Sequence, residues 1–392
     1  MNLQEIANRL NINTYPDALN EIQNYNNVPD ISNVQWLEDL ENTYHILGKY
    51  YHLVYQAALE LQNDESRYHW GMTAAKYLTY CTVPEARDIP MPSRDGTLAG
   101  DFLPLLILLT LLPTCVEESI RRKMPEDMIR RNLDHIVDGI SIVEYETGRP
   151  AINLVYFRWL VKFFKVVLFN CNGFNFEIRT LPGEVYVLQD NTTGSLHPVL
   201  YKGRIHSSGH ILNSAGCPET DDYFYARVTE TEDEFIAFPC INNLVSRETA
   251  VFPKNKYNLV LQSGDHVLSV HIPRGTDISN ASARRSLTAG FKMAVSLFPE
   301  LDLKALYCHS WLLDPAFEHL LKPGSKIVQF GNIFTRYPSK SAGKEVFSFV
   351  FRHPMPLEEL PENTSLERSV KQYYLNGNFI LAYSGVILPD QL

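Results

Sequence analysis

The sequence predicts an α+β protein in which an all-helical domain at residues 1–168 is followed by a mixed α/β domain with a central twisted sheet at residues 169–392. Apolar residues recur at helical spacing in the first part. After residue 169 the pattern changes to short β-branched and aromatic runs separated by Gly, Pro, Asn and Asp, which is typical of strands. A length of 392 residues fits two domains, because single cores stop growing at roughly 250 to 300 residues.

Helices are expected in the N-terminal domain at 2–10, 17–24, 36–61, 65–80, 102–118, 126–138 and 150–168. The range 36–61 carries apolar residues at i, i+3, i+4 and i+7 throughout. The proline-rich segment 83–96 is expected to be a loop, because proline lacks the donor that a helix interior needs. The apolar run 102–112 has only about half of the roughly 20 residues that span a bilayer, so it is expected to be a buried core helix.

Strands are expected in the C-terminal domain at 174–181, 184–190, 197–203, 223–230, 234–240, 267–272, 305–311, 326–337, 346–352 and 379–388, and helices at 281–298, 314–321 and 365–376. The segment from His266 to Leu313 contains a strand, a helix and a second strand, which together form a βαβ unit. Ligands tend to bind where such strands end. Any chemistry is therefore expected in this segment.

The composition and charge of the chain limit the classes of binding partner that are expected. A net charge of −10 and a pI near 5.7 argue against nucleic-acid binding, which normally requires a basic surface. Six cysteines without a CxxC pair are expected to be reduced thiols. The first residues lack the basic start and apolar core of a signal peptide, so a cytoplasmic protein with no membrane partner is expected.

His271 is the best candidate for a general base. Side chains alternate faces along a strand, so His271 shares the more polar face of 267–272 with Val267 and Ser269. An imidazole titrates near neutral pH and could take a proton from an attacking amine or alcohol. The alternative is a histidine that only makes a hydrogen bond at the strand end.

The turn and helix start that follow form a candidate phosphate site. Backbone N–H groups at a helix N-terminus attract anions. Arginines nearby could add charge-assisted hydrogen bonds. The alternative is an ordinary helix cap with surface arginines. The candidate binding residues are Arg274, Gly275, Ser279, Ser282, Arg284 and Arg285.

Cys308 and Ser310 are further catalytic candidates on the second strand. Cys308 cannot pair with His309 as nucleophile and base, because neighbours on a strand point to opposite faces. His271 is the better partner for Cys308 if the two strands are adjacent. A buried structural thiol is the alternative. His206, His210 and Cys217 lie within twelve residues, but their spacing is a weak metal signal and no metal is expected.

Three segments resemble a family of bacterial acyltransferases that have a helical N-acyltransferase-type N-terminal domain and a GNAT-like C-terminal domain. They are GDHVLSVHIPRG (264–275), YCHSWLLDP (307–315) and KIVQFGNIF (326–334), with SRETAVFP (246–253) and FRWLVKFF (157–164) in support. The resemblance implies a sheet in which two parallel strands, 267–272 and 305–311, separate to admit an acyl-CoA. The turn 273–282 would receive the pyrophosphate, and His271 would act as base.

The expected activity is transfer of an acyl group from a CoA-type thioester to an amine or hydroxyl of a small-molecule acceptor, with acyl-CoA as cosubstrate. One alternative is a catalytically inactive GNAT-like module that binds small molecules or acts as a scaffold. Another is a two-step reaction in which Cys308 carries the acyl group. A homodimer is a further possibility for the assembly. Motifs of other enzyme classes, such as GxSxG, GxxxxGK[ST] and GxGxxG, are absent.

Overall fold

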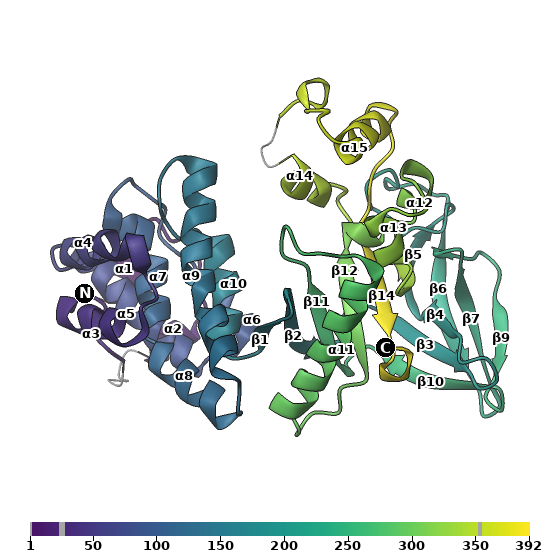
Figure 1. The fold of residues 1–392 in the computed structure, drawn as a ribbon, viewed down its shortest axis with the longest axis horizontal. Helices are drawn as coiled ribbons and strands as arrows, with labels where there is room; N and C mark the ends of the chain where they lie inside the picture. The colour runs from purple at the N-terminus through teal and green to yellow at the C-terminus, as the bar shows by residue number, and fades with distance from the viewer. Residues whose placement is uncertain (1, 23–27, 352–354) are drawn as a thin grey trace. The chain divides into compact units, whose positions relative to one another are not determined.

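The computed structural model describes residues 2–22, 28–351 and 355–392, and the chain divides into two compact units, Met1–Asn170 and Cys171–Leu392. Figure 1 shows that helices make up the first unit, whereas the second contains both strands and helices.

Unit 1 is a helical bundle. Its elements are α1 (Leu3–Arg9), α2 (Ala18–Glu21), α3 (Val34–Tyr44), η2 (Gly48–Tyr50), α4 (Tyr51–Leu61), α5 (Glu65–Tyr80), α6 (Val83–Ala86), α7 (Leu98–Leu109), α8 (Leu112–Arg121), α9 (Glu126–Thr147) and α10 (Leu154–Phe164). This confirms the all-helical prediction. The loop predicted at 83–96 is wrong at its start, where Val83–Ala86 form α6 with Pro84 in the first turn, a position that tolerates proline. The end of the predicted helix 17–24 lies outside the described residues.

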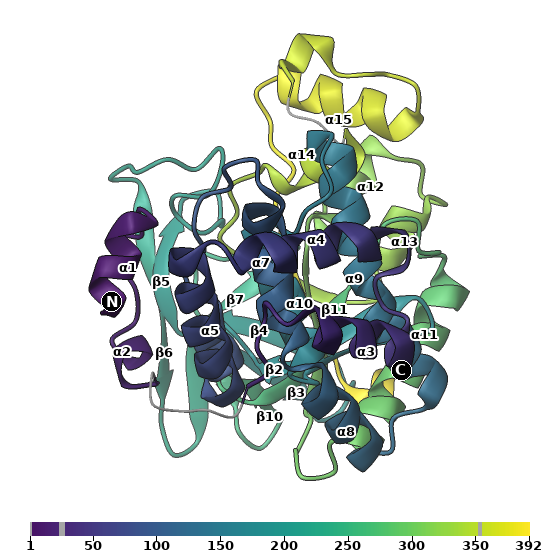
Figure 2. The ribbon, with the colours of Figure 1, turned by 90° about the vertical axis from the view of Figure 1, so that its left-hand side faces the viewer.

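The apolar helix α7 is the centre of the bundle, where it contacts α4, α5 and α10 (Figure 2). Its residues from Ala99 to Leu109 are all buried. The stretch Leu98–Arg121 is long and apolar enough to cross a membrane by length and composition alone, but 83% of its most apolar window is buried inside the protein. Within the described residues, α7 therefore has the burial expected of a core helix, as the sequence predicted.

The predicted helix 36–61 is interrupted. His45 adopts a left-handed conformation with φ of 50°, and it ends α3. The Glu41 carboxylate accepts hydrogen bonds from the backbone N–H groups of Ile46, Leu47 and Gly48, which stabilises the irregular segment before α4. Apolar periodicity continues across this break, so the periodicity alone could not reveal it.

Unit 2 contains two sheets. The first has the order β1-β2-β11-β12-β14-β13, and the second has the order β10-β3-β4-β7-β6-β5, with β8 and β9 also paired to β7. The strands are β1 (Leu168–Cys171, at the unit boundary), β2 (Phe174–Thr180), β3 (Val185–Asp190), β4 (Leu196–Leu200), β5 (Lys202–His206), β6 (Tyr223–Glu230), β7 (Glu234–Ile241), β8 (Leu244–Val245), β9 (Ala250–Pro253), β10 (Tyr257–Gln262), β11 (His266–His271), β12 (Ala305–Ser310), β13 (Thr335–Pro338) and β14 (Tyr383–Ile387).

Each face of the first sheet has its own covering layer. On one face, α11 (Asn280–Leu297) packs against β2 and β11 (Figure 1). On the other, Val267, Tyr307 and Val386 join a core cluster with Val187 and Leu261 of the second sheet. Mixed helix and sheet in unit 2 confirm the predicted α+β class.

The strand predicted at 346–352 is wrong, and the strand predicted at 326–337 is confirmed only at its end, because tertiary packing outweighs β-propensity. Residues 326–337 form the helix α13 (Lys326–Gly331) before β13, and Phe330 of that helix makes an edge-to-face contact with Phe174. Residues 346–352 form α14 (Glu345–Val350), in which the rings of Phe347 and Phe351 meet at helical i, i+4 spacing. Arg352 lies outside the described residues. The remaining elements of unit 2 are η3 (Trp311–Leu313), α12 (Phe317–Leu320), η4 (Leu357–Glu359), α15 (Ser365–Leu375) and η5 (Pro389–Gln391).

Gly290 lets α11 approach the sheet closely. A Cβ atom at this position would lie 2.2 Å from the ring of Phe176, which is fully buried on β2. We expect Gly290→Ala to lower the free energy of unfolding by about 1–3 kcal/mol, because the ring or the helix must move. Urea denaturation of the variant measures this loss. Gly324→Ala is the control, since no atom lies within 4 Å of its added Cβ.

Asp314 connects the end of β12 to the start of β14. Its buried carboxylate accepts hydrogen bonds from the N–H groups of Ala316 (2.8 Å) and Leu381 (2.5 Å). Burial raises its pKa to about 6, although these two bonds and Arg336 act in the opposite direction.

The raised pKa gives a pH dependence of stability. The pKa of Asp314 in the folded protein exceeds the unfolded value of about 3.9. Its contribution to the free energy of unfolding is therefore complete below about pH 4 and is lost as the pH rises through about 6. In the wild type, the free energy of unfolding should therefore fall by up to about 3 kcal/mol over this pH range because of Asp314, and Asp314→Asn should abolish this fall. Urea denaturation at several pH values between 4 and 7.5 tests this, and parallel pH profiles for the two proteins would contradict it.

Candidate functional site

The parallel strands β11 and β12 separate at their carboxyl ends. They pair only from Val267 with Ala305 to Ser269 with Tyr307. Beyond this point β11 continues to His271 along β2, and β12 continues to Ser310 along β14. A gap therefore opens between the two central strands of the sheet, and the backbone groups that face it have no ladder partner across the gap in the described residues.

His271 lies at the edge of this gap and pairs with Glu177 of β2. The distance between His271 Nε2 and Glu177 Oε2 is 2.8 Å. Glu177 is 7% exposed, whereas the His271 side chain is 30% exposed. An ionised carboxylate can only accept, so Nε2 carries the proton and, in the neutral ring, Nδ1 carries the lone pair. A base that a carboxylate holds in one tautomer is the arrangement of acyl-transfer and hydrolytic sites.

Cys308 lies on the opposite face from His271. The parallel register aligns His271 with the level of His309, and neighbours on a strand alternate faces. The predicted pairing of Cys308 with His271 is therefore not formed. Cys308 is completely buried, and burial raises the pKa of its thiol to about 12, which disfavours the thiolate needed for nucleophilic attack.

Ser310 has a structural contact at the end of β12. Its hydroxyl accepts a hydrogen bond from the N–H of Leu312 and so caps the short helix η3. This is the role of an ordinary N-cap serine.

His309 is the residue of β12 that shares the face and the level of His271. It pairs with Ser384 of β14, and its side chain is exposed. Neighbouring protein atoms still remove part of the water around the ring, and this desolvation lowers its pKa. Arg179 lowers the pKa further, whereas Glu345 raises it. The ring is therefore neutral at pH 7.

The turn after β11 is held in place by the β1–β2 turn. The Thr276 hydroxyl donates to Gly173 O (3.1 Å), and the Ser286 hydroxyl donates to Asn172 O (2.8 Å). Gly275 has a φ of 81°, a conformation that favours glycine.

The N-terminus of α11 has an unusual cap. Ser279 stands at the N-cap position, but its hydroxyl donates to Asp277 Oδ2 (2.9 Å) instead of accepting from the helix. Asp277 also binds Lys326 Nζ at 2.9 Å, and this contact, with those to Ser279, lowers the pKa of Asp277. The first N–H groups of α11 thus have no side-chain cap in the described structure.

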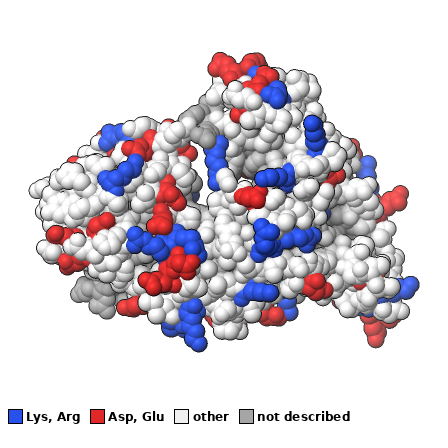
Figure 3. All heavy atoms as spheres, viewed as in Figure 1, with Lys and Arg blue, Asp and Glu red and all other residues white. Residues whose placement is uncertain are grey.

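The predicted phosphate-binding arginines differ in their surroundings. Arg284 donates to Gln391 O at 3.3 Å, and Arg285 is exposed, while Ser282 is half-buried in the first turn of α11. Figure 3 shows Lys and Arg side chains gathered over α11 on the face seen in Figure 1. This local positive charge contrasts with the net charge of the chain.

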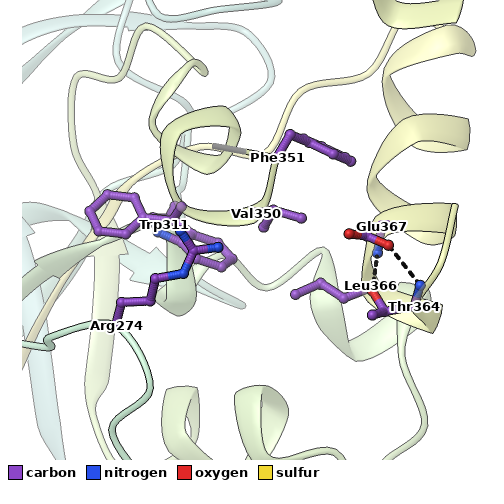
Figure 4. Close-up of a pocket in the computed structure, with 8 residues that line it drawn as sticks. Arg274, Trp311, Val350, Phe351, Thr364, Leu366 and Glu367 are labelled. Atoms are coloured by element: carbon purple, nitrogen blue, oxygen red, sulfur yellow. Dashed lines mark hydrogen bonds between the residues drawn. The ribbon is translucent and has the colours of Figure 1, made fainter. Parts of the chain in front are cut away.

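Arg274 lines a pocket of about 460 Å³ with Trp311, which follows β12. Figure 4 shows Arg274 beside Trp311, with Val350 and Phe351 opposite and Glu367 at the start of α15. The walls combine apolar side chains with the charged Arg274 and Glu367. The remaining lining residues are Phe349, Thr364 and Leu366.

His206, His210 and Cys217 surround the hydroxyl of Ser208 instead of a common metal position. Ser208 Oγ lies 2.8 Å from His206 Nδ1, 3.0 Å from His210 Nδ1 and 3.6 Å from Cys217 Sγ. His210 Nε2 also contacts the Tyr383 hydroxyl at 3.1 Å. Across the described residues, no group of three or more His, Cys, Asp or Glu side chains is arranged to hold a metal ion.

Glu177 and His309 were not predicted from the sequence. Alternation places Asn175, Glu177 and Arg179 on one face of a strand whose other residues are mostly apolar. That charged residue within a strand was the available signal for Glu177. His309 could be found only once the parallel register with β11 was known.

Known proteins have a similar sequence profile and a similar fold. Residues 200–387 match the sequence profile of a family described as GNAT-like C-terminal domain. A crystal structure of a mutant acyltransferase with octanoyl-CoA is similar at a TM-score of 0.65 and 15% identity, over 99% of both chains. One of an acyltransferase with decanoyl-CoA and teicoplanin gives 0.64 and 16%, over 99% of both chains. No curated protein sequence matches the chain.

A further acyltransferase structure with decanoyl-CoA gives a TM-score of 0.65 and 17% identity, over 99% of this chain and 100% of the other. Likeness at such low identity establishes the fold. The prediction of a helical N-terminal part followed by a GNAT-like C-terminal domain is therefore confirmed.

Proposed function

We propose that this protein transfers an acyl group from an acyl-CoA thioester to an amine, with the donor inserted between β11 and β12. The observation that carries the proposal is the gap between these strands, with the Glu177–His271 pair at its edge. The unpaired backbone groups would bind the amides of the pantetheine arm. The structural neighbours with octanoyl-CoA and decanoyl-CoA support this class of donor.

The turn 273–282 would bind the CoA phosphates. The first N–H groups of α11 lack a side-chain cap, and Arg274, Arg284 and Arg285 supply positive charge nearby. Ser282 lies in the first turn of the helix, and Gly275 gives the preceding turn its positive φ.

His271 would act as the general base of a direct transfer. The amine nitrogen attacks the thioester carbon, His271 Nδ1 takes the proton, and the carbon–sulfur bond breaks to release CoA as a thiolate that is then protonated. Glu177 holds the ring and stabilises the imidazolium. The buried Cys308 makes the alternative acyl-cysteine route unfavourable. The homodimer and the cytoplasmic location stay predictions.

Binding and turnover of octanoyl-CoA test the proposal. Calorimetry should show binding of CoA, and hydroxylamine should give octanoyl-hydroxamate and free CoA with the wild-type protein. Ser282→Glu places a negative charge where the helix dipole tolerates it but where it repels phosphate, so the Kd for CoA should rise about tenfold or more. Ser296→Glu, at an exposed position near the other end of α11, is the control.

The outcomes separate the alternatives. Absence of CoA binding by the wild-type protein would overturn the donor assignment. Binding without any thioester turnover would favour the inactive small-molecule module. An equal loss of affinity in Ser282→Glu and Ser296→Glu would remove the phosphate site from the α11 N-terminus.

A further inference from the structure

His309 lies on β12, across the strand gap from His271 on β11. The last paired residues are Ser269 and Tyr307, so two further residues along each strand bring His271 and His309 to the same face and the same level. The backbone at His309 is fixed by pairing with Ser384, which pairs in turn with Tyr337 of β13. The gap thus has an imidazole on each side.

The two imidazoles have different environments. His271 binds the Glu177 carboxylate at 2.8 Å. In the described residues, neither ring nitrogen of His309 makes a hydrogen bond, and its side chain is exposed while Tyr307 and Cys308 before it are buried. A neutral imidazole always carries one N–H donor. His309 therefore presents a donor that the protein itself does not use.

The reaction needs a donor at this place. When an amine attacks a thioester, the electron pair of the carbonyl double bond moves to oxygen, and the negative charge must be stabilised until the carbon–sulfur bond breaks. His271 is occupied with the amine proton. A neutral imidazole is a suitable hydrogen-bond donor for this oxygen, because it always keeps one N–H group.

We propose that His309 donates a hydrogen bond to the thioester carbonyl oxygen and stabilises the oxyanion that forms there, an inference that rests on the proposed acyl transfer. The nitrogen–carbon bond forms as the oxyanion appears. The carbon–sulfur bond then breaks, the carbonyl is restored, and the proton taken by His271 passes to the CoA thiolate. His309 is neutral before and after the step, so no proton is gained or lost there.

The roles of donor and base are separated by two substitutions. His309→Ala should lower kcat about 100-fold with octanoyl-CoA and hydroxylamine, because it removes one oxyanion donor. The KM for octanoyl-CoA should stay within about threefold, because the contact strengthens only in the transition state. His309→Gln keeps an N–H donor but cannot act as a base, so it should recover about tenfold of the lost rate.

Controls make each outcome decisive. His319→Ala, an exposed histidine on α12, should keep the wild-type rate. Thermal unfolding and CoA calorimetry show whether each variant is folded and binds the donor. A His309→Ala rate within twofold of wild type would overturn the inference alone, as would a Gln variant no faster than Ala. A wild-type protein that releases no CoA would overturn the proposed function, and this inference with it.

Discussion

Replacing His271 by alanine is expected to lower kcat for acyl transfer to an amine by about 10²–10⁴-fold, the range that a positioned general base contributes. The imidazole lies at the gap edge with one nitrogen bound to Glu177, and in the neutral ring the other nitrogen carries the lone pair that takes a proton. Stopped assays of free CoA with octanoyl-CoA and a primary amine measure the rate. CoA affinity should change little, because the proposed role of His271 is in the chemical step and not in binding the phosphates.

Two companion variants identify the origin of the loss. Glu177→Gln keeps the shape of the partner but removes its charge. Its kcat should therefore lie between that of His271→Ala and that of the wild type. His266→Ala removes an exposed histidine at the start of the same strand and should leave kcat unchanged. If His271→Ala retained more than a third of the wild-type kcat, another group would have to be the base.

The two strands and the helix at the centre of the candidate site could be predicted from the local residue pattern. Residues 267–272 and 305–311 combine β-branched and aromatic side chains between turn residues, and 281–298 has helical periodicity, so both strands and the helix are confirmed as β11, β12 and α11. The segments 326–337 and 346–352 have the same strand-like composition, but residues 326–331 lie in α13 and residues 346–350 lie in α14. Phe330 contacts the ring of Phe174 and Phe347 contacts the ring of Tyr374, and such contacts between distant parts of the chain are not readable from a single segment.

The partners in the proposed catalytic site could be identified only once the strand pairing was known. Glu177 reaches His271 because β2 is antiparallel to β11, with Glu177 opposite Ser269. These residues are 94 positions apart in the sequence, so no local motif connects them. The choice between Cys308 and His309 likewise depended on the register of β12. Alternation along one strand excluded their pairing with each other, but it could not say which one shares a face with His271.

Asp101 is a buried carboxylate of unit 1 that binds two arginines. Its carboxylate lies in the first turn of α7, is 1% exposed, and binds Arg94 Nε at 2.6 Å and an Arg149 terminal nitrogen at 2.8 Å. The backbone carbonyl of Asp101 also accepts from the N–H of Ile152 at 3.1 Å. One carboxylate thus joins the segment between α6 and α7, the helix α7 itself and the segment before α10.

Asp101→Ala should lower the free energy of unfolding by about 2–4 kcal/mol, because it leaves two guanidinium groups without their carboxylate and opens a cavity. The value lies below that of a fully buried pair, since the Arg94 and Arg149 side chains are 30% and 50% exposed and water can solvate them. Asp101→Asn keeps the volume and should lose less. Urea denaturation followed by tryptophan fluorescence measures this, because Trp36, Trp70 and Trp159 all lie in unit 1.

Asp127→Ala is the matched control for a surface ion pair. Asp127 binds Arg131 at 2.7 Å, but both side chains are largely exposed, at 69% and 45%, so its removal should cost less than about 1 kcal/mol. The distance in this ion pair is nearly the same as the 2.8 Å between Asp101 and Arg149, yet its loss would then change the free energy of unfolding much less. Equal losses in Asp101→Ala and Asp127→Ala would mean that burial of the carboxylate, and the three chain segments that it joins, does not determine the stability of unit 1.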